Sequence, residues 1–104
     1  MAYESIIYEK KDNIAYITFN RPDTLNALDI KMQTELKQAL NEVDNDDEVR
    51  VVILTGAGRA FISGGDINWR RMVTEAPFEL YLQHDVLMRL CLYMERMRVP
   101  VIAA

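Results

Sequence analysis

The residues of this chain with the clearest chemical use are two adjacent glycines, Gly64 and Gly65, followed by Asp66. They lie in the stretch AFISGGDI, residues 60–67, which follows the apolar run VVIL at residues 51–54 and a small turn. Glycine has no Cβ, so a substrate carbonyl can approach the backbone N–H groups of such a pair. A fixed N–H donor stabilises negative charge that develops on an acyl oxygen and is worth about 3 kcal/mol of barrier. The pattern therefore favours an oxyanion hole.

The same residues also have structural interpretations. A glycine pair is common in tight turns, so Gly64 and Gly65 alone do not define a site. Asp66 could act as a general base beside an acyl group. It can also cap a helix that begins after it, where its carboxylate accepts from free N–H groups and interacts favourably with the helix dipole. We favour the cap for Asp66, and the flanking segments decide in favour of the oxyanion hole for the glycines.

The first elements that must position this loop are a hairpin and a helix. Residues 5–9 and 13–20 are short β-branched and aromatic runs, and the charged residues 10–12 between them predict the turn of a hairpin. Asp29 can cap a helix that runs to about Val43, because apolar residues repeat at helical spacing over this range.

The second half of the chain predicts two strands and another helix. Residues 49–55 are almost continuously apolar, which is typical of a parallel strand covered on both faces. A helix is predicted over residues 77–97, with Pro77 in its first turn, and Pro100 starts a new extended run. This alternation predicts an α/β fold with right-handed crossovers and one domain, residues 1–104, with no internal linker.

Three segments of the chain resemble the crotonase family, also called the enoyl-CoA hydratase/isomerase family. NRPDTLNAL (residues 20–28) resembles its first coenzyme A loop, VVILTG (51–56) its strand, and AFISGGDI (60–67) its oxyanion-hole segment, in family order and spacing. PVIAA (100–104) resembles the strand that leads to a second glycine-rich loop. The resemblance implies a crotonase-like ββα spiral, of which this chain supplies the N-terminal half, about two turns, with a mostly parallel sheet and an N-terminal hairpin.

The resemblance also assigns roles in the oxyanion hole. It implies that the backbone N–H of Gly65 is one donor and that Gly64 is the turn glycine before it. The family's second donor and the two glutamates that hydratases use as base and acid would lie beyond Ala104. We therefore expect the 104-residue chain to be part of a longer protein and to be inactive alone.

Coenzyme A contacts are implied for backbone groups of the same two loops. The residues that the resemblance places next to the ligand are Leu25, Ala27, Ser63, Asp66, Ile67 and Asn68. Asp23 departs from the family, because many members carry a lysine there, close to the nucleotide phosphates. Arg21, Lys31 and Arg59 could replace that cation, although charged loop residues are usually just solvated.

The family resemblance implies an enzyme that acts on acyl-CoA thioesters. We expect an enoyl-CoA hydratase, which adds water syn to a 2-enoyl-CoA, with isomerase, hydrolase or lyase relatives as alternatives. A non-catalytic fragment or interaction module is the further alternative if the chain ends at Ala104. No cofactor is expected besides the coenzyme A of the substrate, and a homo-oligomer, a trimer or a dimer of trimers, is expected from the family.

Composition excludes several other classes. The formal net charge is −4 and no Lys/Arg run is present, which argues against nucleic acid or an anionic membrane surface as a partner. Apolar runs are too short to cross a bilayer. Cys91 is the only cysteine, so a reducing cytoplasm is expected, and core packing is the favoured role of Cys91. His84 is the only histidine, so a multi-histidine metal site is excluded.

One rival interpretation is a dinucleotide-binding βα unit, because Gly56 and Gly58 follow a strand as that motif requires. The third small residue of the motif would fall at Phe61, which is too large for close packing of a helix on a strand. We therefore reject this interpretation on spacing.

Overall fold

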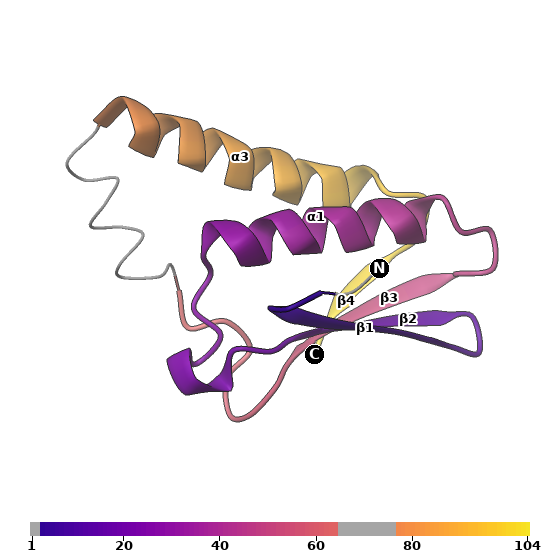
Figure 1. Cartoon of the computed structure of the whole chain (residues 1–104). Coiled ribbons are helices and arrows are strands. Elements are labelled where there is room, and N and C mark those ends of the chain that lie inside the picture. The colour runs from indigo at the N-terminus through magenta and orange to yellow at the C-terminus, as the bar shows by residue number, and fades with distance from the viewer. Residues whose placement is uncertain (1–2, 65–76) are drawn as a thin grey trace.

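The structure, a computed structural model, describes residues 3–64 and 77–104, which form a four-stranded sheet with two long helices (Figure 1). The elements in chain order are β1 (Ile6–Lys11), β2 (Ile14–Phe19), the 3₁₀ helix η1 (Pro22–Thr24), α1 (Ile30–Asp44), β3 (Val51–Gly56), α3 (Pro77–Arg96) and β4 (Val101–Ala103). The sheet order is β1-β2-β3-β4. The predicted α/β class is confirmed. No helix among the described residues is long and apolar enough to span a membrane.

The N-terminal hairpin is confirmed, but its turn lies later than predicted. β1 and β2 pair antiparallel up to Lys11 and Ile14, so the two turn residues are Asp12 and Asn13. Both have positive φ, 52° and 68°, which suits the type I′ turn of a two-residue hairpin. Asp and Asn visit this left-handed region more readily than Lys does, so the turn forms at residues 12 and 13 and both lysines stay in the strand.

Helix α1 begins where the sequence predicts it. The Asp29 side chain accepts a hydrogen bond from the backbone N–H of Met32 at 2.8 Å, which is the N-cap interaction. One face of the helix packs on the sheet through its apolar residues, Met32, Leu36, Ala39, Leu40 and Val43, all of them buried. The amphipathic pattern thus places α1 across β1 and β2.

Strands β2, β3 and β4 run parallel, as predicted, but only one face of this sheet is covered by the described residues. Both helices lie on the same face (Figure 1). Val52 and Leu54 point into the core, whereas Val51 and Ile53 are half-buried. The expectation that this strand is covered on both faces is therefore wrong for the part of the chain described. The continuous apolar run indicated a strand but not how many layers surround it.

Helix α3 lies beside α1 and ends one residue before its predicted end. Leu90 is buried against the core, but Cys91, the next residue, is exposed. The prediction that Cys91 packs in the core is wrong. At 100° per residue, Leu90 and Cys91 point in different directions, and the apolar residues wrapped widely around α3 did not reveal which side faces the sheet.

The acidic turn after α1 contains an ion pair that connects it to the hairpin. The Lys10 Nζ lies 3.0 Å from the Asp46 Oδ2, and the Asp46 Oδ1 accepts from the backbone N–H of Glu48 at 3.0 Å. The lysine hydrogen bond first, and then the backbone bond, hold the pKa of Asp46 below its usual value. This contribution to stability is present above the unfolded-state pKa of Asp46 and is lost as the pH falls through the folded-state pKa.

A buried carboxylate joins α1 to the start of β1. Glu35 is 8% exposed, and its Oε1 accepts from the backbone N–H groups of Glu4 and Ser5 at 3.0 and 2.8 Å. Removing this acceptor leaves Ser5, itself buried, with an N–H that has lost its partner.

We expect Glu35→Ala to lower the free energy of unfolding by about 2–3 kcal/mol, because hydrogen bonds to charged groups contribute more than neutral ones. Urea denaturation of the purified chain measures this. Glu48→Ala is the matched control, since the Glu48 side chain is 76% exposed, and its effect should stay within about 0.5 kcal/mol. Equal effects of the two substitutions would contradict a structural role for the Glu35 carboxylate.

Candidate functional site

Two loops meet where the parallel strands β2 and β3 end. Residues 20–29 follow β2, and residues 57–64 follow β3, and both lie at the end of the sheet next to η1 (Figure 1). Parallel pairing puts the carboxyl ends of neighbouring strands at one edge, which is where ligands bind in open α/β sheets. Segments that are distant in sequence are thus brought together.

The first loop turns tightly around η1. Leu25 and Asn26 both have positive φ, 53° and 57°, and the Leu25 N–H donates to the Pro22 carbonyl at 3.1 Å. The Asn26 N–H donates to the Arg21 carbonyl at 2.8 Å. A leucine in the left-handed region is unusual and costs energy, so the surrounding contacts must hold it there.

The Asn26 side chain makes three further contacts and joins the two loops. It is fully buried, its Oδ1 accepts from the Arg21 N–H at 2.7 Å, and its Nδ2 donates to the carbonyls of Ala57 and Ala60 at 3.0 and 2.7 Å. Both Nδ2 protons and the Oδ1 are therefore used. The family resemblance placed Asn26 in a ligand loop but did not indicate this role, which the tolerance of Asn for positive φ could have suggested.

Two backbone hydrogen bonds then align the predicted ligand segments with each other. The Ser63 N–H donates to the Leu25 carbonyl at 3.1 Å, and the Leu28 N–H donates to the Gly64 carbonyl at 2.7 Å. The Ser63 hydroxyl also donates to the Thr24 carbonyl at 3.4 Å. Leu25, Ser63 and Gly64, all predicted site residues, therefore lie side by side, and the chain from Leu25 to Leu28 includes Ala27.

The predicted site residues differ in exposure. Ala27 is 9% exposed and Leu25 is half-buried, whereas Ser63 and Gly64 are exposed. The predicted residues Gly65, Asp66, Ile67 and Asn68 lie outside the described residues. The oxyanion donor and the Asp66 cap thus stay predictions, while the loop that leads to them is placed.

Two glycines of the second loop have opposite surroundings. A Cβ on Gly56 would lie 2.1 Å from the Ala60 carbonyl oxygen, so the tight return of this loop requires glycine. Gly64 has φ of +140°, and no described atom lies within 4 Å of the position that a Cβ would take there. Gly64 thus adopts a conformation that favours glycine.

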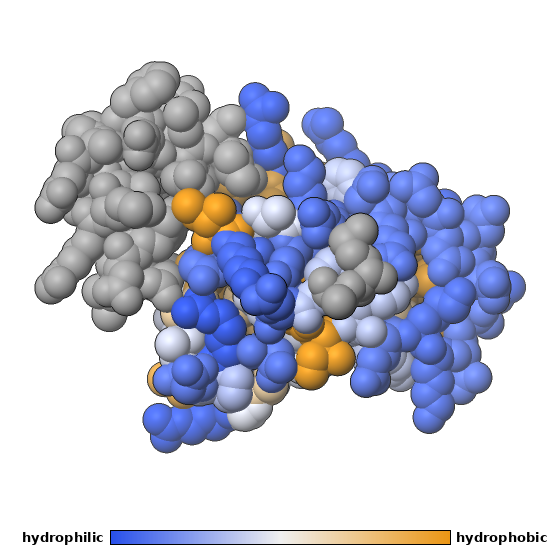
Figure 2. All heavy atoms as spheres, in the orientation of Figure 1, coloured by the Kyte–Doolittle hydropathy of each residue, from blue (hydrophilic) through white to orange (hydrophobic). Residues whose placement is uncertain are grey.

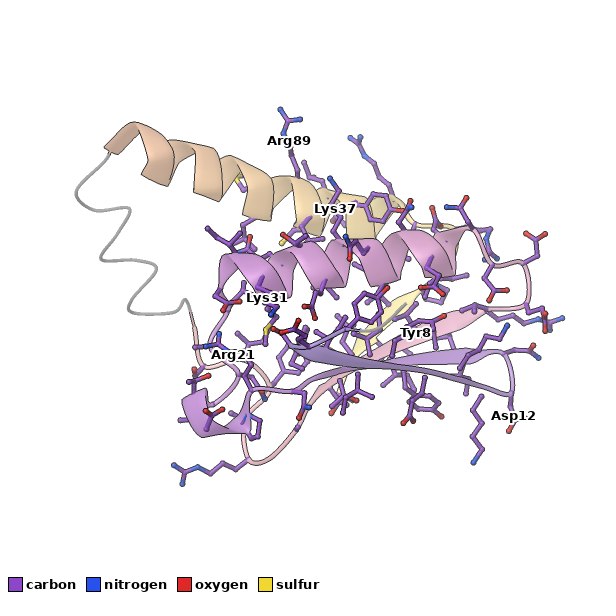
Figure 3. All side chains as sticks on the ribbon, in the orientation of Figure 1. Tyr8, Asp12, Arg21, Lys31, Lys37 and Arg89 are labelled. Atoms are coloured by element: carbon purple, nitrogen blue, oxygen red, sulfur yellow. The ribbon has the colours of Figure 1, made fainter. Side chains whose placement is uncertain are left out.

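Two cations of this region, Arg21 and Lys31, which are labelled in Figure 3, pair with acids of the same chain. The Arg21 Nη1 lies 3.0 Å from the Asp29 Oδ2 and donates to the Ala27 carbonyl at 2.7 Å, and the Lys31 Nζ pairs with Glu4. The hydrogen bond from Lys31 is the main reason that the pKa of Glu4 lies below its usual value. Of the three candidate phosphate ligands, Arg59 alone is exposed without a described ion pair.

An apolar cavity of about 700 Å³ lies next to the second loop, between the C-terminal half of α3 and strands β3 and β4. Phe61 and Ile62 line its end nearest the glycines, and Phe61 packs edge-on against Phe19 with ring centroids 5.3 Å apart. The cavity can receive apolar groups. Viewed from the side of Figure 1, by contrast, the surface is mostly hydrophilic, with hydrophobic residues in small patches (Figure 2).

Metal and dinucleotide chemistry find no support in this part of the chain. Among the side chains that the structure describes, those of residues 3–64 and 87–104, no three His, Cys, Asp or Glu cluster closely enough to hold a metal ion. Gly56 and Gly58 lead into turns and bends up to residue 64 and not into a helix, so the dinucleotide-binding interpretation also fails on structure.

Comparisons with known proteins show which family the chain resembles over most of its length. The family model described as Enoyl-CoA hydratase/isomerase matches residues 9–104. The short-chain-enoyl-CoA hydratase of Clostridium acetobutylicum is 37% identical over 107 residues, and the crotonyl-CoA hydratase of Syntrophomonas wolfei is 37% identical over 106 residues. Each alignment covers 100% of this chain and 40% of the relative, so the chain spans less than half of their length.

The fold comparison agrees with the sequence comparison. The crystal structure of an enoyl-CoA hydratase from Shewanella pealeana superposes with a TM-score of 0.90 at 26% identity, over 96% of this chain and 38% of that chain. The four-stranded sheet and its helices therefore form part of a crotonase fold, as the resemblance implied.

We expect Asn26→Ala to lower the free energy of unfolding by about 3–4 kcal/mol, because three backbone groups lose their partner and alanine adopts positive φ poorly. Amide hydrogen exchange should also speed up at Leu28 and Ser63. Asn13→Ala is the matched control, since Asn13 is an exposed asparagine with φ of 68° and carries the conformational cost alone, about 1 kcal/mol. Similar losses at both positions would contradict a special role for Asn26.

Proposed function

The chain belongs to the enoyl-CoA hydratase/isomerase family, and we propose that it forms the N-terminal part of an enoyl-CoA hydratase that adds water syn to a 2-enoyl-CoA thioester. Two observations support this proposal. Relatives named as hydratases align with the whole chain, and the two segments that resemble the ligand loops are hydrogen-bonded to each other in the structure. The loops would thus form one surface for the thioester.

In the proposed mechanism the Gly65 N–H donates to the thioester carbonyl. Addition of water to the conjugated double bond moves negative charge onto that oxygen, so a fixed donor stabilises the transition state more than the ground state. Gly64 has positive φ, and its conformation would direct the next N–H toward the substrate. The second donor and the acid and base would come from residues of the full protein that follow this part.

Coenzyme A would be bound mainly by backbone groups of the two loops. We propose Leu25, Ala27, Ser63, Asp66, Ile67 and Asn68 as its neighbours. Since Arg21 and Lys31 already pair with Asp29 and Glu4, Arg59 is the remaining candidate to approach a phosphate. Asp23 is exposed and would repel a phosphate, so the cationic support differs from that of members with a lysine there.

The assembly and setting of the full protein are also proposals. We propose a homo-oligomer, a trimer or a dimer of trimers, in the cytoplasm, without a cofactor beyond the coenzyme A of the substrate. The net charge of −4 supports neither nucleic acid nor an anionic membrane surface as a partner. Isomerase, hydrolase and lyase reactions share the oxyanion hole, so they remain the alternatives for this site.

A chimera tests the function directly. We expect that replacing the matching N-terminal 40% of the Clostridium acetobutylicum hydratase with this chain gives a protein that hydrates crotonyl-CoA, followed by the loss of enoyl-thioester absorbance. The 104-residue chain alone should show no hydration. A folded chimera that binds crotonyl-CoA without hydrating it, while the parent hydratase is active, would contradict the proposal.

The donor role of Gly65 is tested in the same chimera. We expect Gly65→Pro, which removes the N–H, to lower kcat by about 10²- to 10³-fold, as the loss of one oxyanion donor does in other enzymes. Gly65→Ala keeps the N–H and is the matched control for added bulk. Coenzyme A binding should survive in both variants. Equal kcat values in the two variants would show that the Gly65 N–H is not the donor.

A further inference from the structure

A second region, on helix α1, contains a buried side-chain amide without a hydrogen bond to the described residues. Gln33 on α1 is 4% exposed, and neither its Nε2 nor its Oε1 has a partner among the described residues. An unsatisfied buried polar atom costs about 1–3 kcal/mol, so leaving two is expensive. Natural proteins rarely leave such groups unpaired unless a ligand, an ion or water meets them.

Gln33 lines a groove between the two helices. The groove has a volume of about 450 Å³, within the usual range for small-molecule sites, roughly 300–1,000 Å³. Ile30, Gln33 and Lys37 contribute from α1, and Arg89, Leu90 and Tyr93 contribute from α3. Lys37 and Arg89 project from the two helices on the side away from the sheet (Figure 3).

The groove combines hydrogen-bonding, apolar, aromatic and charged side chains. The Gln33 amide offers one donor group and one acceptor at its buried side, and Ile30 and Leu90 are apolar. Lys37 is exposed and makes no ion pair within the described part of the chain, so its charge is available. Burial, and then the Asp44 carboxylate, raise the pKa of Tyr93, so its ring stays neutral at physiological pH.

We propose that this groove binds an adenine nucleotide. A glutamine amide pairs with the N6 donor and N7 acceptor of adenine through two hydrogen bonds, and tyrosine rings stack on bases. Lys37 and Arg89 would then attract the phosphate. The ligand is defined by this chemistry, and both a free nucleotide and the nucleotide end of coenzyme A carry it.

This pairing accounts for all the features of the groove together. A buried water molecule could satisfy the Gln33 amide but would leave the charge of Lys37 at the groove without a role. A free phosphate would use the cations but not the amide. An adenine nucleotide uses the amide, the aromatic ring and the positive charge. The inference involves none of the residues of the proposed hydratase site, so the two proposals fail independently.

The test is a titration of the ¹⁵N-labelled 104-residue chain with AMP. We expect chemical-shift changes in the Gln33 side-chain NH₂ group and in the backbone amides of Lys37 and Tyr93. Gln33→Leu should weaken AMP binding at least about fivefold, the lower end of what a two-bond contact with adenine contributes. It should also raise the melting temperature, because the unpaired amide is removed. Lys37→Ala should weaken binding of AMP but not of adenosine.

The matched control is Gln38→Leu, the same substitution at an exposed glutamine of the same helix, which should leave AMP binding unchanged. GMP, with acceptors at both N7 and O6, should bind more weakly than AMP. Coenzyme A shifting the same signals, with pantetheine silent, would support the groove and assign the nucleotide to coenzyme A. Shifts elsewhere, equal binding of inorganic phosphate, unchanged affinity in Gln33→Leu, or concentration-dependent self-association through Gln33 would each overturn the proposal.

Discussion

The site depends on one buried side chain, the amide of Asn26, and the three hydrogen bonds it makes. Its Oδ1 fixes the start of the loop after β2, and its Nδ2 binds two carbonyls of the loop after β3. Because the amide is fully buried, losing any of these partners would leave an unsatisfied polar atom. The two loops therefore have a defined relative position, and the hydrogen bonds to Ser63 and Gly64 follow from it.

Two charged side chains of the same loop, Arg21 and Asp29, pair with each other. Arg21 binds the carboxylate that also caps α1, since Asp29 accepts from Met32 with one oxygen and pairs with Arg21 through the other. One aspartate thus connects the helix start to the loop. A side chain held in this way is poorly suited to follow a mobile phosphate, because moving it would release both the carboxylate and the Ala27 carbonyl. An arginine that holds a loop together is less suited to bind a ligand. The contacts described for Arg21 are of the first kind, since they join it to Asp29 and Ala27.

Sequence patterns predicted what depends on local chemistry. The hairpin, the Asp29 cap, the parallel strand at residues 51–56 and the helix that starts at Pro77 follow from propensity, capping and apolar spacing, and all are present. The patterns did not predict which faces of a strand or helix are buried, because burial depends on the layers that surround the element. The run around Val52 does not reveal that one face of the sheet is uncovered in the described residues, and Cys91 illustrates the same failure on a helix.

The role of Asn26 was harder to predict from the sequence. Its partners, the carbonyls of Ala57 and Ala60, lie in a loop 31 and 34 residues later in the chain. Sequence spacing placed Leu25, Ala27, Ser63 and Gly64 in ligand loops through family resemblance. Nothing in the local pattern of either loop specified that the two touch. The parallel pairing of β2 with β3 brings them together, and that pairing is a property of the whole sheet.

Helix α1 carries two buried polar side chains that illustrate how structural and functional roles can be separated. Glu35 is almost fully buried and meets two backbone N–H groups, so its burial is explained by the fold itself. Gln33, two residues earlier, is buried to a similar degree and meets none of the described polar atoms. An apolar residue of similar size would fit the helix interface at lower cost. Gln33 is thus a residue of α1 whose type the fold does not explain, and such residues are candidates for a function beyond folding.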